Sequence, residues 1–186
     1  MKKILFIFTL LILATIKINA QPQKGSYDDT EEKFAIKINP LSFFVLTSNT
    51  SLEYKVNKNL GAQIGFGYTG ITISSLKYEG IRLTPELRFY TKGKALSGFY
   101  LAPYFRYQHY QLTDGLNKLL YVSYGGGLSF GFQKIFNSGF VLDIFVGPGY
   151  NSGKFSSIEG SKQEESLIFG LNGTTVRTGI TLGFAF

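Results

Sequence analysis

Bulky apolar residues alternate with small or polar residues along most of the chain after Phe34, and the last segment shows this pattern most clearly. Alternate positions there form one bulky set: Thr174, Val176, Thr178, Ile180, Leu182, Phe184 and Phe186. The residues between them are small or polar: Gly173, Thr175, Arg177, Gly179, Thr181, Gly183 and Ala185. Because successive side chains of a strand point to opposite faces, this alternation predicts a strand with one apolar face and one small or polar face.

The same alternation recurs in earlier segments and predicts eight strands in all. The other segments are residues 34–39, 51–56, 62–69, 81–90, 99–108, 120–133 and 140–147. Compact Asn- and Gly-rich hairpin connections are predicted at 57–61, 91–97 and 137–139, and more variable connections at 47–50, 74–78, 111–118 and 151–172. Because short and long connections follow one another in turn, we expect tight turns at one rim and loops at the other. Asn39-Pro40 interrupts the first segment, since proline cannot donate to a strand ladder.

Volume and charge indicate which face of the sheet points inward. An eight-stranded barrel has an interior just wide enough to be filled by side chains, so the bulky set would overfill it. The small face also carries the charged residues, and we expect them to form an ionic network in the lumen: Lys37, Glu53, Lys55, Arg82, Glu86, Arg88, Arg106, Asp143 and Arg177. A polar interior within an apolar wall is typical of membrane barrels. The sequence therefore predicts an all-β fold, an eight-stranded antiparallel transmembrane up-and-down β-barrel whose apolar face meets lipid.

The first twenty residues have the organisation of a secretory signal peptide. Lys2 and Lys3 precede an apolar run over residues 4–16, and a short polar stretch then ends at Ala20. This run is shorter than the roughly 20 residues that a membrane-spanning helix needs. We therefore expect a signal peptide at 1–20, a flexible leader at 21–32 and a barrel at 33–186, in a protein exported to the cell outer membrane with both termini in the periplasm.

The composition narrows the range of functions. The chain has no Cys, which excludes a disulfide framework and a Cys-ligated metal site. Removal of Lys2, Lys3 and Lys17 with the signal peptide lowers the formal net charge from +7 to +4. This modest excess gives no reason to expect nucleic acid as a partner. Charged residues make up 17% of the chain, against roughly 25% in typical soluble domains, which fits a protein that is not surrounded by water alone.

Taken together, these features resemble the small outer-membrane barrels of the OmpA/OmpX type found in Gram-negative bacteria. The low Trp content, the abundance of Lys, Asn, Ile and Phe, and the opening Lys37-Ile38-Asn39-Pro40 are similar to the Bacteroidota branch of that group. The resemblance implies that outer-membrane lipid and the barrel-insertion machinery are partners. It also implies that this machinery reads alternating apolar residues in the terminal strand, which here are Ile180, Leu182, Phe184 and Phe186.

Two local features suggest chemistry, and both have a simpler structural interpretation. Residues Gly65 to Gly70 match the G-x-G-x-x-G pattern, but no helix is predicted after them to hold a pyrophosphate. We interpret these glycines as small inward residues of a strand. His109 is the only histidine and is expected on the outward face near the loop rim. Some outer-membrane barrels hydrolyse lipids with a His and a Ser near that rim. No Ser-His-acid set can be assembled from the sequence, which favours a residue of the interfacial aromatic belt.

The inward charges are compatible with two arrangements. Buried charges must pair, so Arg82, Glu86 and Arg88 on one strand and Arg106 on the next either form a salt-bridge plug or line a gated polar pore. Six basic and three acidic residues leave three positive charges over, which need water, anions or tyrosine hydroxyls. A plug is favoured because eight strands leave little room for a channel.

The expected function is therefore non-enzymatic: a structural anchor or surface-interaction protein that acts through its extracellular loops. The partner of these loops is unknown. A narrow transporter is the alternative, and a lipid-modifying hydrolase is less favoured. No catalytic residue, metal site or cofactor is predicted.

Overall fold

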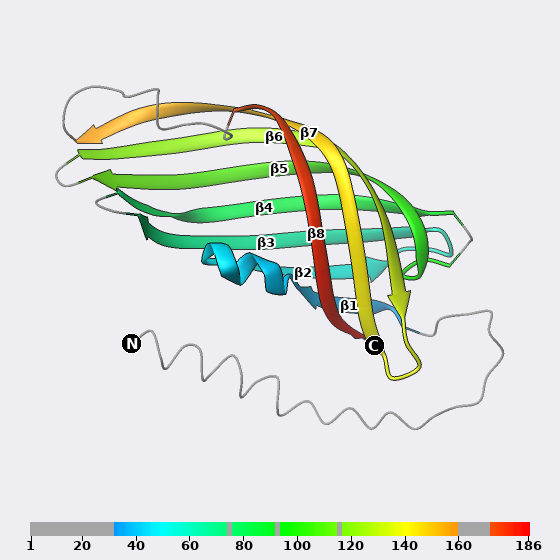
Figure 1. The fold of residues 1–186 in the computed structure, drawn as a ribbon. Coiled ribbons are helices and arrows are strands. Elements are labelled where there is room, and N and C mark those ends of the chain that lie inside the picture. The colour runs from blue at the N-terminus through cyan, green and yellow to red at the C-terminus, as the bar shows by residue number, and fades with distance from the viewer. Residues whose placement is uncertain (1–31, 74–75, 92–93, 115–116, 160–171) are drawn as a thin grey trace.

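The computed structural model describes residues 32–73, 76–91, 94–114, 117–159 and 172–186, and these form a closed barrel of eight antiparallel strands (Figure 1). Each strand pairs with its neighbours in the sequence, and the first strand pairs with the last. The strands are β1 (Phe34–Ile38), β2 (Thr47–Lys55), β3 (Leu60–Ile73), β4 (Leu76–Tyr90), β5 (Gly98–Asp114), β6 (Asn117–Ile135), β7 (Phe140–Glu159) and β8 (Gly173–Ala185). The predicted eight-stranded up-and-down barrel is thereby confirmed. The predicted signal peptide and all of the leader except Glu32 lie outside the described residues.

Several strands are longer than the sequence pattern predicts. Residues 47–50, 76–78, 111–114, 117–118 and 151–159 were expected in connections but belong to strands. The predicted long connections at 74–78 and 111–118 are therefore wrong, because only two residues separate β3 from β4 and β5 from β6. The backbones of these strand residues continue the ladders of the neighbouring strands, as in the pairing of Tyr121 with Phe155. Backbone pairing does not require alternating hydrophobicity, so the ladder continues where the side-chain pattern fades.

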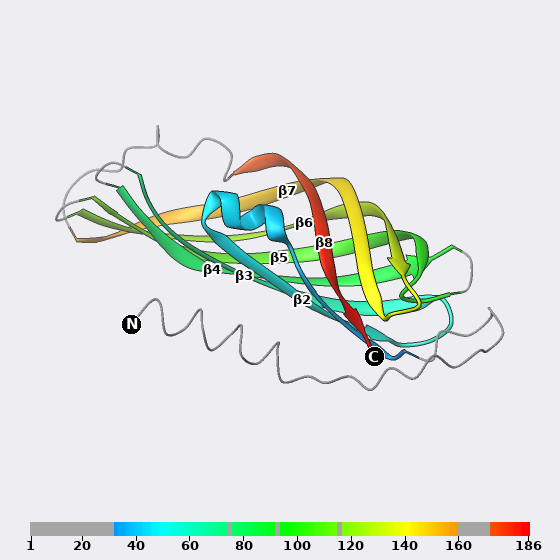
Figure 2. The ribbon, with the colours of Figure 1, turned by 60° about the horizontal axis from the view of Figure 1, so that its bottom comes forward.

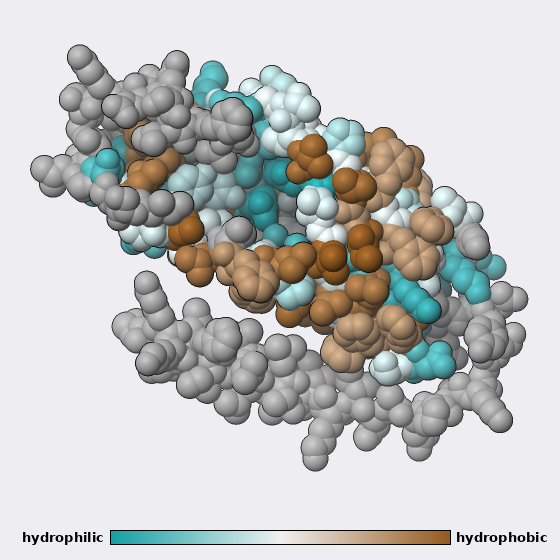
Figure 3. All heavy atoms as spheres, in the orientation of Figure 1, coloured by the Kyte–Doolittle hydropathy of each residue, from teal (hydrophilic) through white to brown (hydrophobic). Residues whose placement is uncertain are grey.

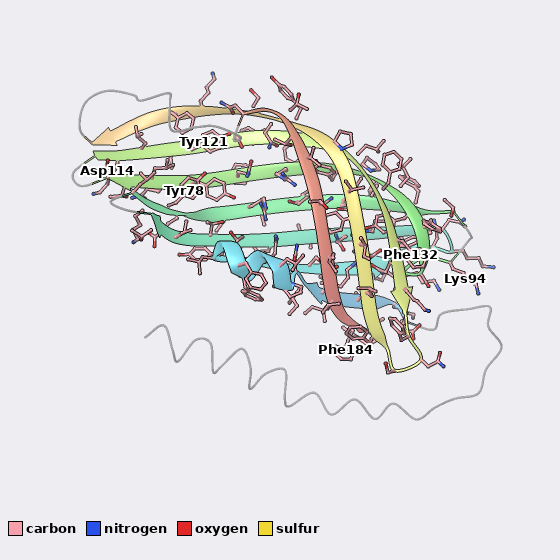
Figure 4. All side chains as sticks on the ribbon, in the orientation of Figure 1. Tyr78, Lys94, Asp114, Tyr121, Phe132 and Phe184 are labelled. Atoms are coloured by element: carbon pink, nitrogen blue, oxygen red, sulfur yellow. The ribbon has the colours of Figure 1, made fainter. Side chains whose placement is uncertain are left out.

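The two rims of the barrel differ. The connections 56–59 and 136–139, residues 91 and 94–97 of the connection between β4 and β5, and the C-terminus lie at one end, which we call the tight-turn end. At the opposite end, the loop end, β3 to β7 extend well past β8 and β1 (Figure 1). Figure 4 shows Tyr78, Asp114 and Tyr121 toward the loop end, and Lys94 and Phe184 toward the tight-turn end.

The seam between β1 and β8 is short. Their register runs only from Ala35–Ala185 to Ile38–Leu182, although β8 begins at Gly173. After Ile38 the chain leaves the sheet and forms the 3-10 helix η1 (Pro40–Val45). Asn39 caps this helix by accepting a hydrogen bond from Leu41 N at 3.0 Å, and proline suits its first position because its missing N–H needs no partner there. Figure 2 shows η1 beside β8 at this seam.

Apolar side chains cover the outside of the barrel, and polar ones fill its inside. Outward residues such as Ile144, Phe130 and Val146 are 46%, 53% and 53% exposed. In contrast, Lys37, Glu53, Arg88 and Asp143 are at most 1% exposed. Figure 3 shows apolar residues over the middle of the visible face and hydrophilic ones in a hollow between them. Within the described residues, no helix is long and apolar enough to cross a membrane.

Candidate functional site

Six charged side chains meet in the lumen and form what we call the ionic cluster: Lys37, Glu53, Glu86, Arg88, Asp143 and Arg177. They come from β1, β2, β4, β7 and β8. Each was predicted to face inward, and the barrel brings them into direct contact. Three cations face three carboxylates, so their formal charges cancel. This pairing offsets part of the free energy needed to remove the charges from water.

Lys37 and Arg88 are the two cations at the centre of the cluster. Lys37 Nζ lies 2.6 Å from Glu53 Oε2 and 3.3 Å from Asp143 Oδ2. Arg88 Nη1 lies 3.2 Å and 2.9 Å from the same two carboxylate oxygens, and its Nε donates to Glu86 Oε1 at 2.6 Å. Both cations also donate to Gln133 Oε1, at 2.5 Å and 3.0 Å. These contacts cross the lumen, so they tie opposite walls of the barrel together.

Tyrosine hydroxyls satisfy the remaining carboxylate oxygens. Tyr90 Oη donates to Glu53 Oε1 at 2.6 Å, and Tyr100 Oη donates to Asp143 Oδ1 at 2.7 Å. The Arg88 guanidinium also lies 4.3 Å from the centre of the Tyr100 ring. These two tyrosines were not part of the predicted network, although the alternation of side chains along their strands places both on the inward face. Hydrogen bonds to each charge make the buried cluster favourable enough to persist.

The connection between β4 and β5 closes the tight-turn end of the lumen. Ala95 and Leu96 are fully buried, and Gln133 Nε2 donates to Leu96 O at 2.8 Å. Ala95 N also donates to Lys58 O, at 2.7 Å, in the neighbouring turn. The residues of this turn thus cover the ionic cluster on its tight-turn side. This arrangement supports a salt-bridge plug and not an open pore.

Arg177 joins the cluster to the upper part of the lumen. Its Nη1 pairs with Glu86 Oε2 and donates to Ser129 Oγ at 3.1 Å. Its guanidinium lies 4.7 Å from the centre of the Tyr104 ring and 4.6 Å from that of Phe145. Arg177 therefore has one carboxylate partner and two aromatic neighbours.

The other three predicted network residues do not enter the cluster. Lys55 lies at the tight-turn rim and is partly exposed. Arg82 and Arg106 are partly buried toward the loop end, and neither forms an ion pair with a carboxylate in the described part of the chain. Arg106 was expected to meet Glu86. In the strand register, Tyr104 and not Arg106 is opposite Glu86. The Arg106 guanidinium instead lies 5.3 Å from the centre of the Tyr104 ring.

A cavity of about 200 Å³ lies next to the ionic cluster, on its loop-end side. Its wall contains the guanidinium-bearing residues Arg82, Arg106 and Arg177, and Asp143 is its one acidic residue. Polar side chains of β2, β3 and β4 and of Asn39, which follows β1, complete the wall, including Asn49 and Thr84. The sequence did not predict this cavity, because its existence depends on strand register and on the early end of β1.

The features that suggested enzymatic chemistry remain isolated. Residues Gly65 to Gly70 lie inside β3, so no helix N-terminus follows them. His109 is partly exposed on the outward face, where its Nδ1 lies 3.3 Å from Tyr107 Oη. No group of acidic and histidine side chains in the described ranges is placed to hold a metal ion.

Comparisons with known proteins identify a family. The structure is similar to the crystal structure of Acinetobacter baumannii CarO, with a TM-score of 0.47 and 11% sequence identity over 83% of this chain and 97% of that chain. No curated protein sequence matches the chain significantly. The model of a family described as a protein of unknown function, DUF3575, matches residues 6–181. Because this match spans most of the sequence, the chain belongs to the DUF3575 family.

Proposed function

We propose that the protein is a non-enzymatic β-barrel of the outer membrane, which anchors surface loops and contacts partners through them. The observation that carries the proposal is the reversed distribution of polarity. Phe, Leu, Ile and Val side chains are exposed around the barrel, while Lys37, Glu53, Arg88 and Asp143 are buried within it. Soluble monomers rarely expose apolar patches of more than a few hundred Å², whereas the apolar band of a membrane barrel is covered by lipid.

The proposed orientation places the tight-turn end in the periplasm and the loop end outside the cell. Periplasmic turns of outer-membrane barrels are short and their extracellular connections longer. At the loop end of this barrel β3 and β4, and likewise β5 and β6, are joined by two residues, so the assignment rests on the connection between β7 and β8, residues 160–172, which is the longest between two strands. The N-terminal signal peptide expected from the sequence would deliver the chain to the envelope, and the barrel-insertion machinery would read Ile180, Leu182, Phe184 and Phe186. The barrel is also proposed to be of the OmpA/OmpX type and of its Bacteroidota branch, which the sequence features described above support.

A structural role is favoured over transport because the lumen is obstructed. Lys37 and Arg88 are held by three carboxylates, and the buried turn with Ala95 and Leu96 lies below them. An ion that crossed the barrel would have to break several charge-assisted hydrogen bonds.

An anchoring role is also favoured over lipid hydrolysis. His109 lies within hydrogen-bond distance of the Tyr107 hydroxyl, and no hydrogen bond joins it to a serine or a carboxylate among the described residues. Purified protein is therefore expected to leave phospholipid and lipopolysaccharide acyl chains intact. Hydrolysis that disappears in His109→Ala but persists in Lys77→Ala would replace the anchor with an enzyme.

Membrane fractionation tests the proposed location. The full-length chain, expressed in a Gram-negative host, should appear in the outer-membrane fraction and migrate differently on a gel before and after boiling. Such heat-dependent migration is the behaviour expected of a closed barrel that resists detergent. Recovery of folded, detergent-free monomer from the periplasm would contradict the proposal.

A further inference from the structure

The cavity above the ionic cluster has an excess of positive charge. Arg82, Arg106 and Arg177 line it, and Asp143 is already engaged by Lys37 and Arg88. Arg177 is paired with Glu86, but Arg82 and Arg106 have no carboxylate partner in the described parts of the chain. Moreover, Arg106 Nε is buried without a hydrogen-bond partner. Like charges that share a cavity repel one another, and an anion placed between them relieves this repulsion.

The wall also offers neutral hydrogen-bond donors. Asn39, Asn49 and Thr84 line the cavity together with the arginines. Guanidinium groups bind phosphate and carboxylate groups with paired hydrogen bonds, and side-chain amides and hydroxyls can complete the coordination. A volume of about 200 Å³ far exceeds the roughly 30 Å³ that one water molecule occupies in the liquid, so the space suits a hydrated oxyanion.

The cavity opens sideways at the short seam between β1 and β8. Val176 and Thr178 line it although both belong to the outward set of β8, and Val176 is 73% exposed. Opposite them lie Asn39, at the end of β1, and Thr50 of β2. The β1 ladder stops at Leu182, so no β1 residue covers this part of β8. In Figure 3 hydrophilic residues are visible in the hollow on this face.

Apolar side chains lie beside the mouth. The exposed residues of η1 and its cap include Phe43, Phe44 and Leu46, at 50%, 86% and 59% exposure. A molecule with an anionic head and an apolar tail would thus meet arginines inside the mouth and apolar side chains outside it.

We propose that this cavity is a binding site for a phosphate or carboxylate group, which is held by Arg82, Arg106 and Arg177. The lateral mouth is the entrance for a lipid head group. The anionic group arrives either as the head of a lipid or as a free ion, since both present the same oxygens. The lipid route rests on the proposed membrane location, whereas binding of the free ion does not.

Native mass spectrometry in a neutral detergent tests the site. The purified full chain is titrated with dodecyl phosphate, with inorganic phosphate, and with the uncharged dodecyl maltoside as a blank. Arg82→Gln/Arg106→Gln removes the two cations that have no carboxylate partner among the described residues, and should weaken phosphate binding about tenfold or more, because charge-assisted hydrogen bonds are lost. Lys55→Gln removes a lumen-side cation at the opposite end and should leave binding unchanged.

A second variant blocks the cavity without changing its charge. A Cβ at Gly65 would make only ordinary contacts, at 3.5 Å from Thr84 O, so Gly65→Leu can place its side chain into the space. It should reduce binding of either probe. Unchanged heat-dependent gel migration of each variant shows that the barrel is intact and separates a failed site from a failed fold.

The relative affinity of the probes identifies the source of the anion. Tighter binding of dodecyl phosphate than of inorganic phosphate supports a lipid head group, and equal binding supports a free anion. If neither probe binds the intact barrel, or if binding is the same in the arginine double variant, the proposed site is wrong. This result would leave the membrane location standing.

Discussion

Lys37 Nζ lies 2.6 Å from Glu53 Oε2, and neither side chain has any exposed surface. The two residues come from the first and second strands and join a network that reaches Asp143 on β7. Salt bridges therefore hold the interior of this barrel together, whereas a soluble barrel of this size has an apolar core.

Lys37→Met should destabilise the folded barrel by about 3–5 kcal/mol, because it leaves an uncompensated carboxylate in the lumen. Lys77→Met is the matched control: Lys77 Nζ lies 2.8 Å from Glu79 Oε2, but the side chains are 51% and 42% exposed. An exposed pair contributes at most about 1 kcal/mol. Urea unfolding in detergent micelles measures both, and equal losses would show that the lumen pair is no more important than the surface pair.

The intact barrel should show no steady conductance in planar bilayers. The ionic cluster and the buried turn at Leu96 obstruct the path, so current should stay at the level of the protein-free membrane. Stable single-channel steps that change in Arg88→Ala would instead favour a narrow transporter.

Gly131→Ala should destabilise the barrel by about 1–3 kcal/mol through overpacking. A methyl group there would overlap the Tyr100 ring, which is fixed by its hydrogen bond to Asp143. Gly65→Ala adds the same methyl group at a position where it makes only ordinary van der Waals contacts, so the unfolding free energy of this variant should change little. Similar effects of the two substitutions on thermal unfolding would refute this role of Tyr100.

Phe186→Ser should lower the amount of folded barrel in the outer membrane several-fold. The Phe186 carbonyl accepts hydrogen bonds from Lys33 N and Phe34 N at 3.0 Å and 2.9 Å, and its ring stacks on Phe34. Serine retains the backbone bonds, so the loss would report on side-chain recognition during insertion. Phe44→Ser, which removes an exposed aromatic residue outside the terminal strand, should assemble normally. Equal yields of all three proteins would contradict a role for Phe186 as an insertion signal.

The sequence predicted the barrel and the inward set of charges because both follow from the alternation of side chains between the two faces of a strand. Lys37, Glu53, Glu86, Arg88, Asp143 and Arg177 do meet in the lumen. This alternation does not determine which of these residues form ion pairs, since the pairing depends on the register between the strands. Glu86 is opposite Tyr104 and Arg82 is opposite Gln108, so Arg82 and Arg106 are left without carboxylates in the described structure.

Strand ends and the seam were harder to predict. Inward aromatic residues such as Tyr110 and Tyr121 blur the contrast between the faces near the loop end, while the backbone ladder continues there. The helix η1 spans only six residues and has no repeating apolar pattern, although Asn39 followed by proline is a cap signal that could have revealed it. The lateral mouth follows from this early departure of the chain from β1.

Tryptophan quenching by brominated lipid tests the orientation of the barrel wall most directly, because the natural chain contains no Trp. Phe105 and Tyr104 are adjacent on β5, at nearly the same height, but they are 48% and 6% exposed. In vesicles with bromine on the acyl chains, Phe105→Trp should be strongly quenched and Tyr104→Trp should retain most of its fluorescence. Equal quenching of the two, or stronger quenching of Tyr104→Trp, would contradict an apolar wall facing lipid around an ionic lumen.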